Sequence, residues 1–240
     1  MNTQIPHAQD LNAFDLHSRK PFEPGRTPYD GLRPWSAITH GFGILFAVIS
    51  TIILMIRVLP IHGTLQCLGF GIFGLTMFTL YLASTLYHSV NADVPTRIAL
   101  RKFDHSAVYS LIAGTYTPLC LTILHGTTGF ILLALIWTLA IAGIAMAWFW
   151  INCPRKITAA IYIGLGWLSL AVVPFIYQNA GWIPLFWLFL GGILYTIGGV
   201  LYAIKWPGRH NPRFGCHEIF HVFIVLGTVA HFFFVYRCLT

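Results

Sequence analysis

Five polar side chains lie within long apolar stretches of the chain, where polar groups are costly to bury. They are Ser84, His88, Asp104, His217 and His221. An ionisable residue inside a membrane segment is expected to serve a function and to have a partner. Imidazoles, a carboxylate and a hydroxyl are together the groups that bind zinc or support its ligands. These residue types therefore predict a metal site.

The spacing of these residues supports a single site. Ser84 and His88 are four residues apart, as are His217 and His221, so each pair lines one face of a helix. Two histidines at this spacing can share one zinc ion, and a third from a facing helix leaves one tetrahedral position for water, as in catalytic sites. We therefore predict that His88, His217 and His221 are the ligands. Asp104 is predicted to hold or deprotonate the water, and Ser84 to orient a ligand or the substrate.

Each of these residues also has an ordinary structural explanation. A single histidine in a membrane helix can simply hydrogen-bond to a neighbouring helix. Asp104 could occupy a helix start, where a carboxylate suits the dipole, or pair with Arg101. Histidine-rich ligation favours zinc, but copper and nickel suit the same groups.

The remaining polar residues of the apolar stretches are expected to play lesser roles. His40 is predicted to support the site or to pack beside it. His105 and Glu218 directly follow site residues and are predicted to face elsewhere, although Glu218 could cap a helix. His231 is ten residues beyond His221, about 15 Å along a helix, and is predicted to be a buried hydrogen-bonding residue. Cys216 is an unfavoured ligand.

The elements that must position these residues are membrane helices. Hydrophobic residues make up 57% of the 240 residues and charged residues only 9%, against roughly 25% in soluble domains. Seven apolar stretches are long enough to span a bilayer as helices. They lie near residues 35–57, 65–90, 103–124, 128–150, 158–178, 182–203 and 216–238. Short breaks between them predict an all-α, up-and-down bundle of seven transmembrane helices.

The basic residues predict the orientation of this bundle. With a cytoplasmic N-terminus and an external C-terminus, all of the 14 Lys and Arg residues except Arg57 and Arg237 lie on the cytoplasmic side. This orientation places the five site residues at one depth, in the cytoplasmic leaflet. Pro118 and Pro174 are predicted to kink their helices and open a cavity. Paired glycines such as Gly41 and Gly43, Gly164 and Gly166, Gly191 and Gly192, and Gly198 and Gly199 are predicted to allow close helix packing.

The N-terminal segment, the net charge and the cysteines indicate how the chain is organised and which partners it has. Residues 1–33 are polar and lack the pattern of a signal peptide, so they are predicted to be a largely disordered cytoplasmic tail that precedes a membrane domain at 34–240. The net charge of +7 is explained by topology, and no nucleic-acid partner is expected. Five cysteines give no metal-type spacing, and a disulfide between Cys67 and Cys238 is left as an alternative.

Five segments of the chain resemble the bacterial haemolysin III proteins. They are 37–41 (AITHG), 84–88 (STLYH), 104–109 (DHSAVY), 113–118 (AGTYTP) and 217–223 (HEIFHVF). The resemblance covers about residues 33–238. This family is similar to the adiponectin and progestin receptors and, more distantly, to alkaline ceramidases.

The resemblance implies a multi-pass protein of the bacterial inner membrane with a zinc site in the inner leaflet. It implies three histidine ligands (His88, His217 and His221), a water held by Asp104, and Ser84 as the matching serine. Because the ceramidase relatives hydrolyse lipid amides, the expected function is a zinc-dependent lipid acyl hydrolase or another lipid-modifying enzyme. The expected partners are membrane lipids and a lipid-like substrate or ligand.

Two other functions fit the same residues. One is a receptor-like, non-enzymatic regulator of the membrane in which zinc is structural. The other is a cytolytic protein associated with pores, as the family name suggests, although the outer halves of the helices offer few polar residues beyond His231.

Overall fold

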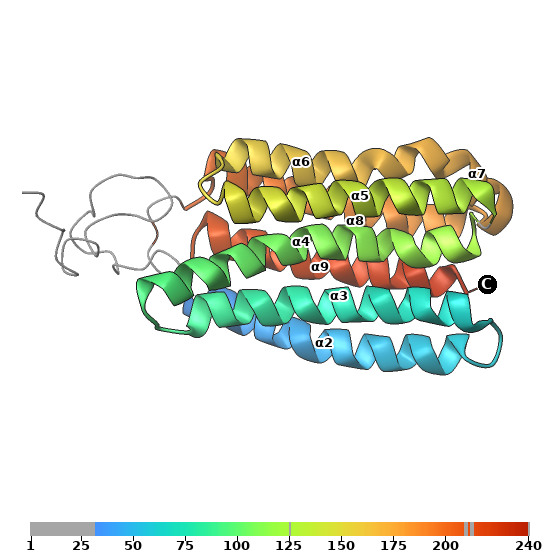
Figure 1. Ribbon diagram of the computed structural model, residues 1–240, viewed down its shortest axis with the longest axis horizontal. Coiled ribbons are helices and arrows are strands. Elements are labelled where there is room, and N and C mark those ends of the chain that lie inside the picture. The colour runs from blue at the N-terminus through green and yellow to red at the C-terminus, as the bar shows by residue number, and fades with distance from the viewer. Residues whose placement is uncertain (1–31, 125, 209–210, 212–213, 240) are drawn as a thin grey trace, which may run out of the picture.

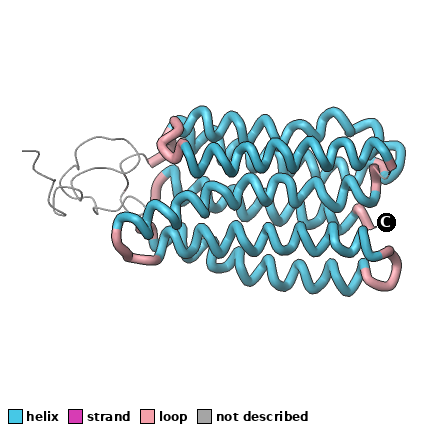
Figure 2. Tube along the Cα trace, in the orientation of Figure 1, coloured by secondary structure: helices cyan, strands magenta, loops and turns pink. Residues whose placement is uncertain are grey.

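Helices that run side by side along one axis make up the bundle (Figure 1). The computed structural model describes residues 32–124, 126–208, 211 and 214–239. The helices are α2 (Pro34–Val58), α3 (Thr64–Ser89), α4 (Val94–Thr122), α5 (Thr127–Phe149), α6 (Arg155–Trp167), α7 (Val173–Ala180), α8 (Trp182–Ile204) and α9 (Cys216–Arg237), with the 3-10 turn η1 (Leu168–Val172) between α6 and α7. These residues contain no strand (Figure 2), so the all-α prediction is confirmed. The predicted tail falls outside them, apart from residues 32 and 33.

Six helical segments are long and apolar enough to cross a membrane. They are α2, α3, α5, α8, α9 and the combined segment Arg155–Ala180. Large apolar side chains cover their outer surface, and Phe42, Leu75 and Ile131 are 63–70% exposed. An exposed apolar surface of this kind is expected to face lipid.

Helix α4 differs from the other long helices in position and in polarity. It was predicted to begin at residue 103, after a break that extended to Lys102, but it begins at Val94, with Pro95 in its first turn. Proline suits a helix start because it has no N–H to leave unpaired there. The extension adds Arg97, Arg101 and Lys102 to the helix. Helix α4 is not among the six candidate spans, because its remaining part, 105–122, is also rich in Ser, Thr and Tyr residues. It lies at the centre of the bundle, packed against α3, α5, α6 and α9.

Short connections join neighbouring helices at alternating ends of the bundle (Figure 2). With α4, seven helical segments follow the bundle axis, as the predicted up-and-down arrangement requires. A seventh membrane crossing by α4 and the direction of the termini stay predictions.

The segment around Pro174 departs from a regular helix, as its proline suggests. Residues Leu168–Val172 form a 3-10 turn, and Pro174 lies in the first turn of α7. The hydroxyl of Tyr116 on α4 lies 2.9 Å from the Leu165 carbonyl oxygen and 2.7 Å from that of Gly166. Tyr116 therefore supplies a hydrogen-bond donor to carbonyl oxygens at the end of α6, next to the break. Pro118 lies inside α4, which continues past it.

Some of the predicted glycine contacts between helices are present and others are absent. Gly43 packs against the ring of Tyr81, Gly191 against His231 and Gly198 against Phe223. By contrast, Gly41, Gly164 and Gly166 have no neighbouring atoms near the position of a Cβ. For these three, the prediction of close packing is wrong.

All five cysteines are free thiols. The alternative of a disulfide between Cys67 and Cys238 is therefore not supported. Cys238 is buried, and its Sγ donates to the Phe234 carbonyl oxygen at 3.4 Å.

The two glycines of α2 predict opposite effects of one substitution. In Gly43→Ala, the new methyl group meets the buried Tyr81 ring, so the free energy of unfolding should fall by about 1–3 kcal/mol. Gly41→Ala adds a methyl group in open space and should be neutral or slightly stabilising. Unfolding in mixed detergent micelles measures both. Equal losses in the two variants would contradict this account of α2–α3 packing.

Candidate metal centre

Three buried histidines from two helices meet at one end of the bundle. His88 is the penultimate residue of α3, and His217 and His221 lie in the first two turns of α9. All three side chains are at most 8% exposed. The ring nitrogens of the three lie within 4.8 Å of one another, and in the described part of the chain this is the only such group of histidine, cysteine or acidic side chains.

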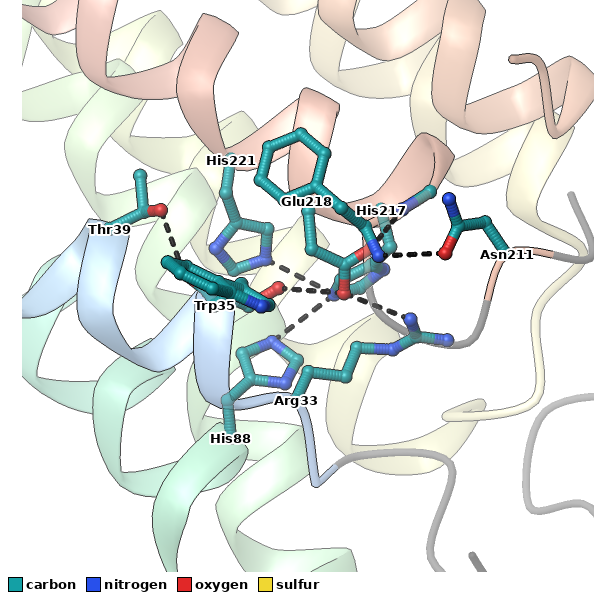
Figure 3. Close-up of polar contacts among 11 residues, drawn as sticks. Arg33, Trp35, Thr39, His88, Asn211, His217, Glu218 and His221 are labelled. Atoms are coloured by element: carbon teal, nitrogen blue, oxygen red, sulfur yellow. Dashed lines mark hydrogen bonds and ion pairs between the residues drawn. The ribbon is translucent and has the colours of Figure 1, made fainter. Parts of the chain in front are cut away.

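The arrangement of the nitrogens suits a metal ion (Figure 3). The Nε2 atom of His217 lies 3.2 Å from Nε2 of His88 and 3.1 Å from Nε2 of His221. Zinc–nitrogen bonds of about 2.0–2.1 Å at tetrahedral angles place ligand nitrogens about 3.3–3.4 Å apart. These two separations are close to this value, and the ligand nitrogens of all three histidines lie within 4.8 Å of one another, so a small adjustment lets them share one ion.

The chemistry of the three rings also fits a cation. The Nδ1 atoms of His217 and His221 are buried and have no hydrogen-bond partner among the described residues. Each neutral imidazole carries one N–H, so three converging Nε2 atoms cannot all be satisfied by hydrogen bonds to one another. A cation at the centre of the group accepts a lone pair from each of them. The cluster can therefore hold a metal, and the identity of the ion stays a prediction.

Local sequence explains why α9 presents its two histidines together. The four-residue spacing puts both on one helical face. Gly215 is the N-cap of α9, and its N–H donates to the Glu218 carboxylate at 2.8 Å. An acidic side chain three residues after the N-cap stabilises a helix start. The prediction that Glu218 caps the helix is confirmed, and this cap supports the turn that carries His217.

Asp104 and Ser84 line a cavity beside the histidines, but neither belongs to the metal-binding group. Ser84 is buried on α3, one turn before His88. Its hydroxyl lies near the Asp104 carboxylate, but the two groups do not form a hydrogen bond of good geometry. Asp104 is the eleventh residue of α4, not part of its first turn as predicted, because the helix begins at Val94. Its proposed role as the water partner stays a prediction.

The cavity has a volume of about 190 Å³ and is lined by α2, α3, α4, α6, α8 and α9. Beyond the polar residues its walls are mainly apolar, and they include Leu111, Ile112, Leu119, Leu188, Phe189 and Ile224. Trp167, the last residue of α6, and Ser169, within η1, also line it. The Trp167 ring nitrogen donates to Thr196 at 2.9 Å, which links α6 to α8 along this wall.

The other histidines of the bundle show one confirmed expectation and one departure. The His40 ring packs on the His221 ring at a centroid distance of 3.9 Å, as its predicted packing role requires. His105 borders both this cavity and a smaller pocket beside α5, so the prediction that its side chain faces elsewhere stays a prediction. The ring nitrogens of His231 are buried without a hydrogen bond of good geometry, although the Leu188 carbonyl is near. Its ring instead packs edge-on against Tyr195 at 5.0 Å.

One residue beside the cluster was missed by the sequence analysis. Arg33, assigned to the polar tail, forms an ion pair with Glu218 at 3.0 Å (Figure 3). The available signal was Glu218 itself, because a carboxylate in a predicted membrane segment requires a partner.

The chain is similar in sequence to several known proteins. The sequence profile of the family described as "Haemolysin-III related" matches residues 34–232. A "Hemolysin-3 homolog" of Bacillus subtilis (strain 168) is 39% identical over 198 residues, which cover 82% of this chain and 90% of the relative. "Hemolysin-3" of Bacillus cereus is 39% identical over 200 residues, covering 82% and 87%. The "Adiponectin receptor protein" of Drosophila melanogaster is 29% identical over 192 residues, covering 71% and 39%.

The histidine cluster predicts stoichiometric metal binding. Purified protein should hold about one zinc ion per chain, because three ligands and one open position form a single site. His88→Ala, His217→Ala and His221→Ala should each lose it, whereas His62→Ala, at the other end of the bundle, should retain it. Elemental analysis after dialysis against a weak chelator measures the content. Full zinc content in any of the three cluster variants would contradict the assignment of that ligand.

Proposed function

We propose that this chain, which belongs to the Haemolysin-III related family and is a multi-pass bacterial membrane protein, is a zinc-dependent hydrolase that cleaves an acyl bond of a membrane lipid. The observation that carries the proposal is the convergence of three buried histidine nitrogens beside a mainly apolar cavity that also holds a carboxylate. A metal, an acid–base group and an apolar binding space are the parts that hydrolysis of a lipid requires.

The three histidines would hold the metal, and the remaining polar residues act on the substrate and on water. A bound zinc ion would supply a Lewis acid that acidifies water and polarises a carbonyl oxygen. Asp104 is the one acidic residue among the described residues that line the cavity. It accepts a proton from the attacking water and returns it to the leaving amine or alkoxide.

Ser84 and the apolar walls position the substrate. Ser84 lies on α3 one turn before His88, and its hydroxyl is near the Asp104 carboxylate, so it can donate to a carbonyl or carboxylate oxygen. The apolar walls of α4, α8 and α9 accommodate a hydrocarbon chain and exclude bulk water. These residues favour a substrate with an acyl chain attached to an amide or ester group.

A non-enzymatic, receptor-like regulator is the second candidate. It is favoured by the similarity to a protein named as an adiponectin receptor over 71% of this chain. In that case the metal only joins α3 to α9, and Asp104 has no catalytic role. The two candidates therefore differ in whether loss of Asp104 abolishes turnover.

The names of the Bacillus relatives raise a third possibility, a cytolytic pore. A pore requires a polar path through the bundle, whereas the described walls of the cavity beyond the site are mainly apolar. Ion flux through purified protein in sealed vesicles tests this alternative.

Asp104→Asn is the decisive variant for hydrolysis. It should lower kcat for release of fatty acid by about 10²–10⁴-fold, because the base is lost, while zinc content stays at the wild-type level. The assay presents an amide-linked ceramide and an ester-linked phospholipid in nanodiscs to the wild type and the variant. Asp93→Asn is the matched control, since Asp93 is an exposed residue just before the same helix.

Two results would reject the enzymatic proposal. One is turnover by Asp104→Asn at the wild-type rate. The other is the absence of fatty-acid release from either lipid by wild-type protein that carries its full complement of zinc.

A further inference from the structure

We infer that Arg33 and Glu218 form a clamp that positions the metal ligands, so that the residue at the start of α2 sets the affinity of the site for its ion. The inference rests on the metal site of the proposed function but not on turnover.

Glu218 receives donors from both helices that begin beside the site (Figure 3). Its carboxylate is 2% exposed. One oxygen, Oε1, accepts from the Arg33 guanidinium at 3.0 Å and from the Ser36 hydroxyl at 3.4 Å. The other, Oε2, accepts from the Gly215 N–H at 2.8 Å. Glu218 thus ties the start of α2 to the first turn of α9.

Arg33 extends this connection to the third ligand. Its backbone N–H donates to the carbonyl oxygen of His88 at 3.0 Å. Its guanidinium binds Glu218, the residue next to His217. A single residue therefore contacts the main chain of one ligand and the side chain adjacent to another.

This bridge matters because of how the two ligand helices pack. Helix α3 packs mainly on α2 and α4, and α9 packs mainly on α8 and α2, with little direct contact between α3 and α9. Helix α2 is thus the neighbour that the two ligand helices share most extensively. The distance from His88 to His217 therefore depends on how α2 contacts the end of α3 and the start of α9. Arg33 lies at this point of contact.

The ion pair is half-buried, since the Glu218 side chain is 2% exposed and that of Arg33 is 24% exposed. Such a pair is better suited to fixing geometry than to adding stability. Removing a guanidinium and a carboxylate from water costs about as much as their attraction returns, so such pairs contribute little net stability. Their best-attested role is to select one register between helices. Groups that orient metal ligands from outside the coordination sphere typically change affinity by about 10–100-fold.

The test is the affinity for zinc, measured by competition with a chromogenic chelator on full-length protein in nanodiscs. Arg33→Gln and Glu218→Gln should each raise the Kd by about 10-fold or more while the stoichiometry stays at one. The Kd of the double variant should not exceed the larger of the two single-variant Kd values, because both changes break the same ion pair. Arg33→Lys, which keeps the charge, should lose less affinity than Arg33→Gln.

Arg57→Gln is the matched control. The Arg57 guanidinium lies 5.4 Å from the centroid of the Tyr236 ring and joins the same two helices, α2 and α9, at their other ends. It should leave the Kd for zinc unchanged. Because Glu218→Gln also alters the cap of α9, Arg33→Gln carries the test if the Glu218 variant does not fold.

The outcomes separate this inference from the proposed function. Wild-type affinity in Arg33→Gln, or an equal loss in Arg57→Gln, overturns the clamp. Affinity that depends on Arg33 in a protein without hydrolytic activity supports the clamp and rejects only the enzymatic proposal. A wild-type protein that binds no zinc rejects both.

Discussion

Hydrocarbon offers no hydrogen bonds, so a polar side chain inside this bundle has to be matched by another part of the protein. This constraint determines which helices lie at the outside of the bundle and which lies at its centre. Helices such as α2 and α5 turn large apolar side chains outward, whereas α4, with its arginines and Asp104, lies at the centre. The three histidines, Asp104 and Glu218 all lie toward the same interior, at the end where α3 finishes and α9 begins. The candidate site is therefore the place where the polar groups of the bundle are gathered.

The same constraint accounts for the cavity beside the site. At η1 the helical hydrogen bonding is interrupted, and the Tyr116 hydroxyl on α4 approaches the carbonyl oxygens of Leu165 and Gly166. The break follows α6, and the Tyr116 hydroxyl that approaches it belongs to α4. Both helices line the cavity. An irregular backbone at this depth is tolerated in membrane proteins where it is buried or faces a cavity.

The sequence was sufficient to predict the helical bundle and the pairing of His217 with His221, because both follow from short-range patterns. Apolar length predicts helices, and a four-residue spacing predicts a shared face. The meeting of His88 with this pair joins residues up to 133 positions apart; it was predicted from the helix directions that the Lys and Arg residues indicate and from the family resemblance. The beginning of α4 was missed because arginines and a lysine ended the apolar run, although the helix continued through them. Arg33 was missed because its partner is 185 residues away, and nothing local to a polar tail indicates such a contact.

The order of the ligands along the chain has a consequence for biosynthesis. His88 precedes His217 by 129 residues, and α9 is the last helix of the described chain. During translation, α2 and α3 leave the ribosome long before the segment that completes the cluster. Until then the side chains of His88 and Arg33 cannot contact His217 and Glu218, their neighbours on α9. A metal that these three histidines share can therefore be bound only after α9 has been synthesised and packed against the earlier helices.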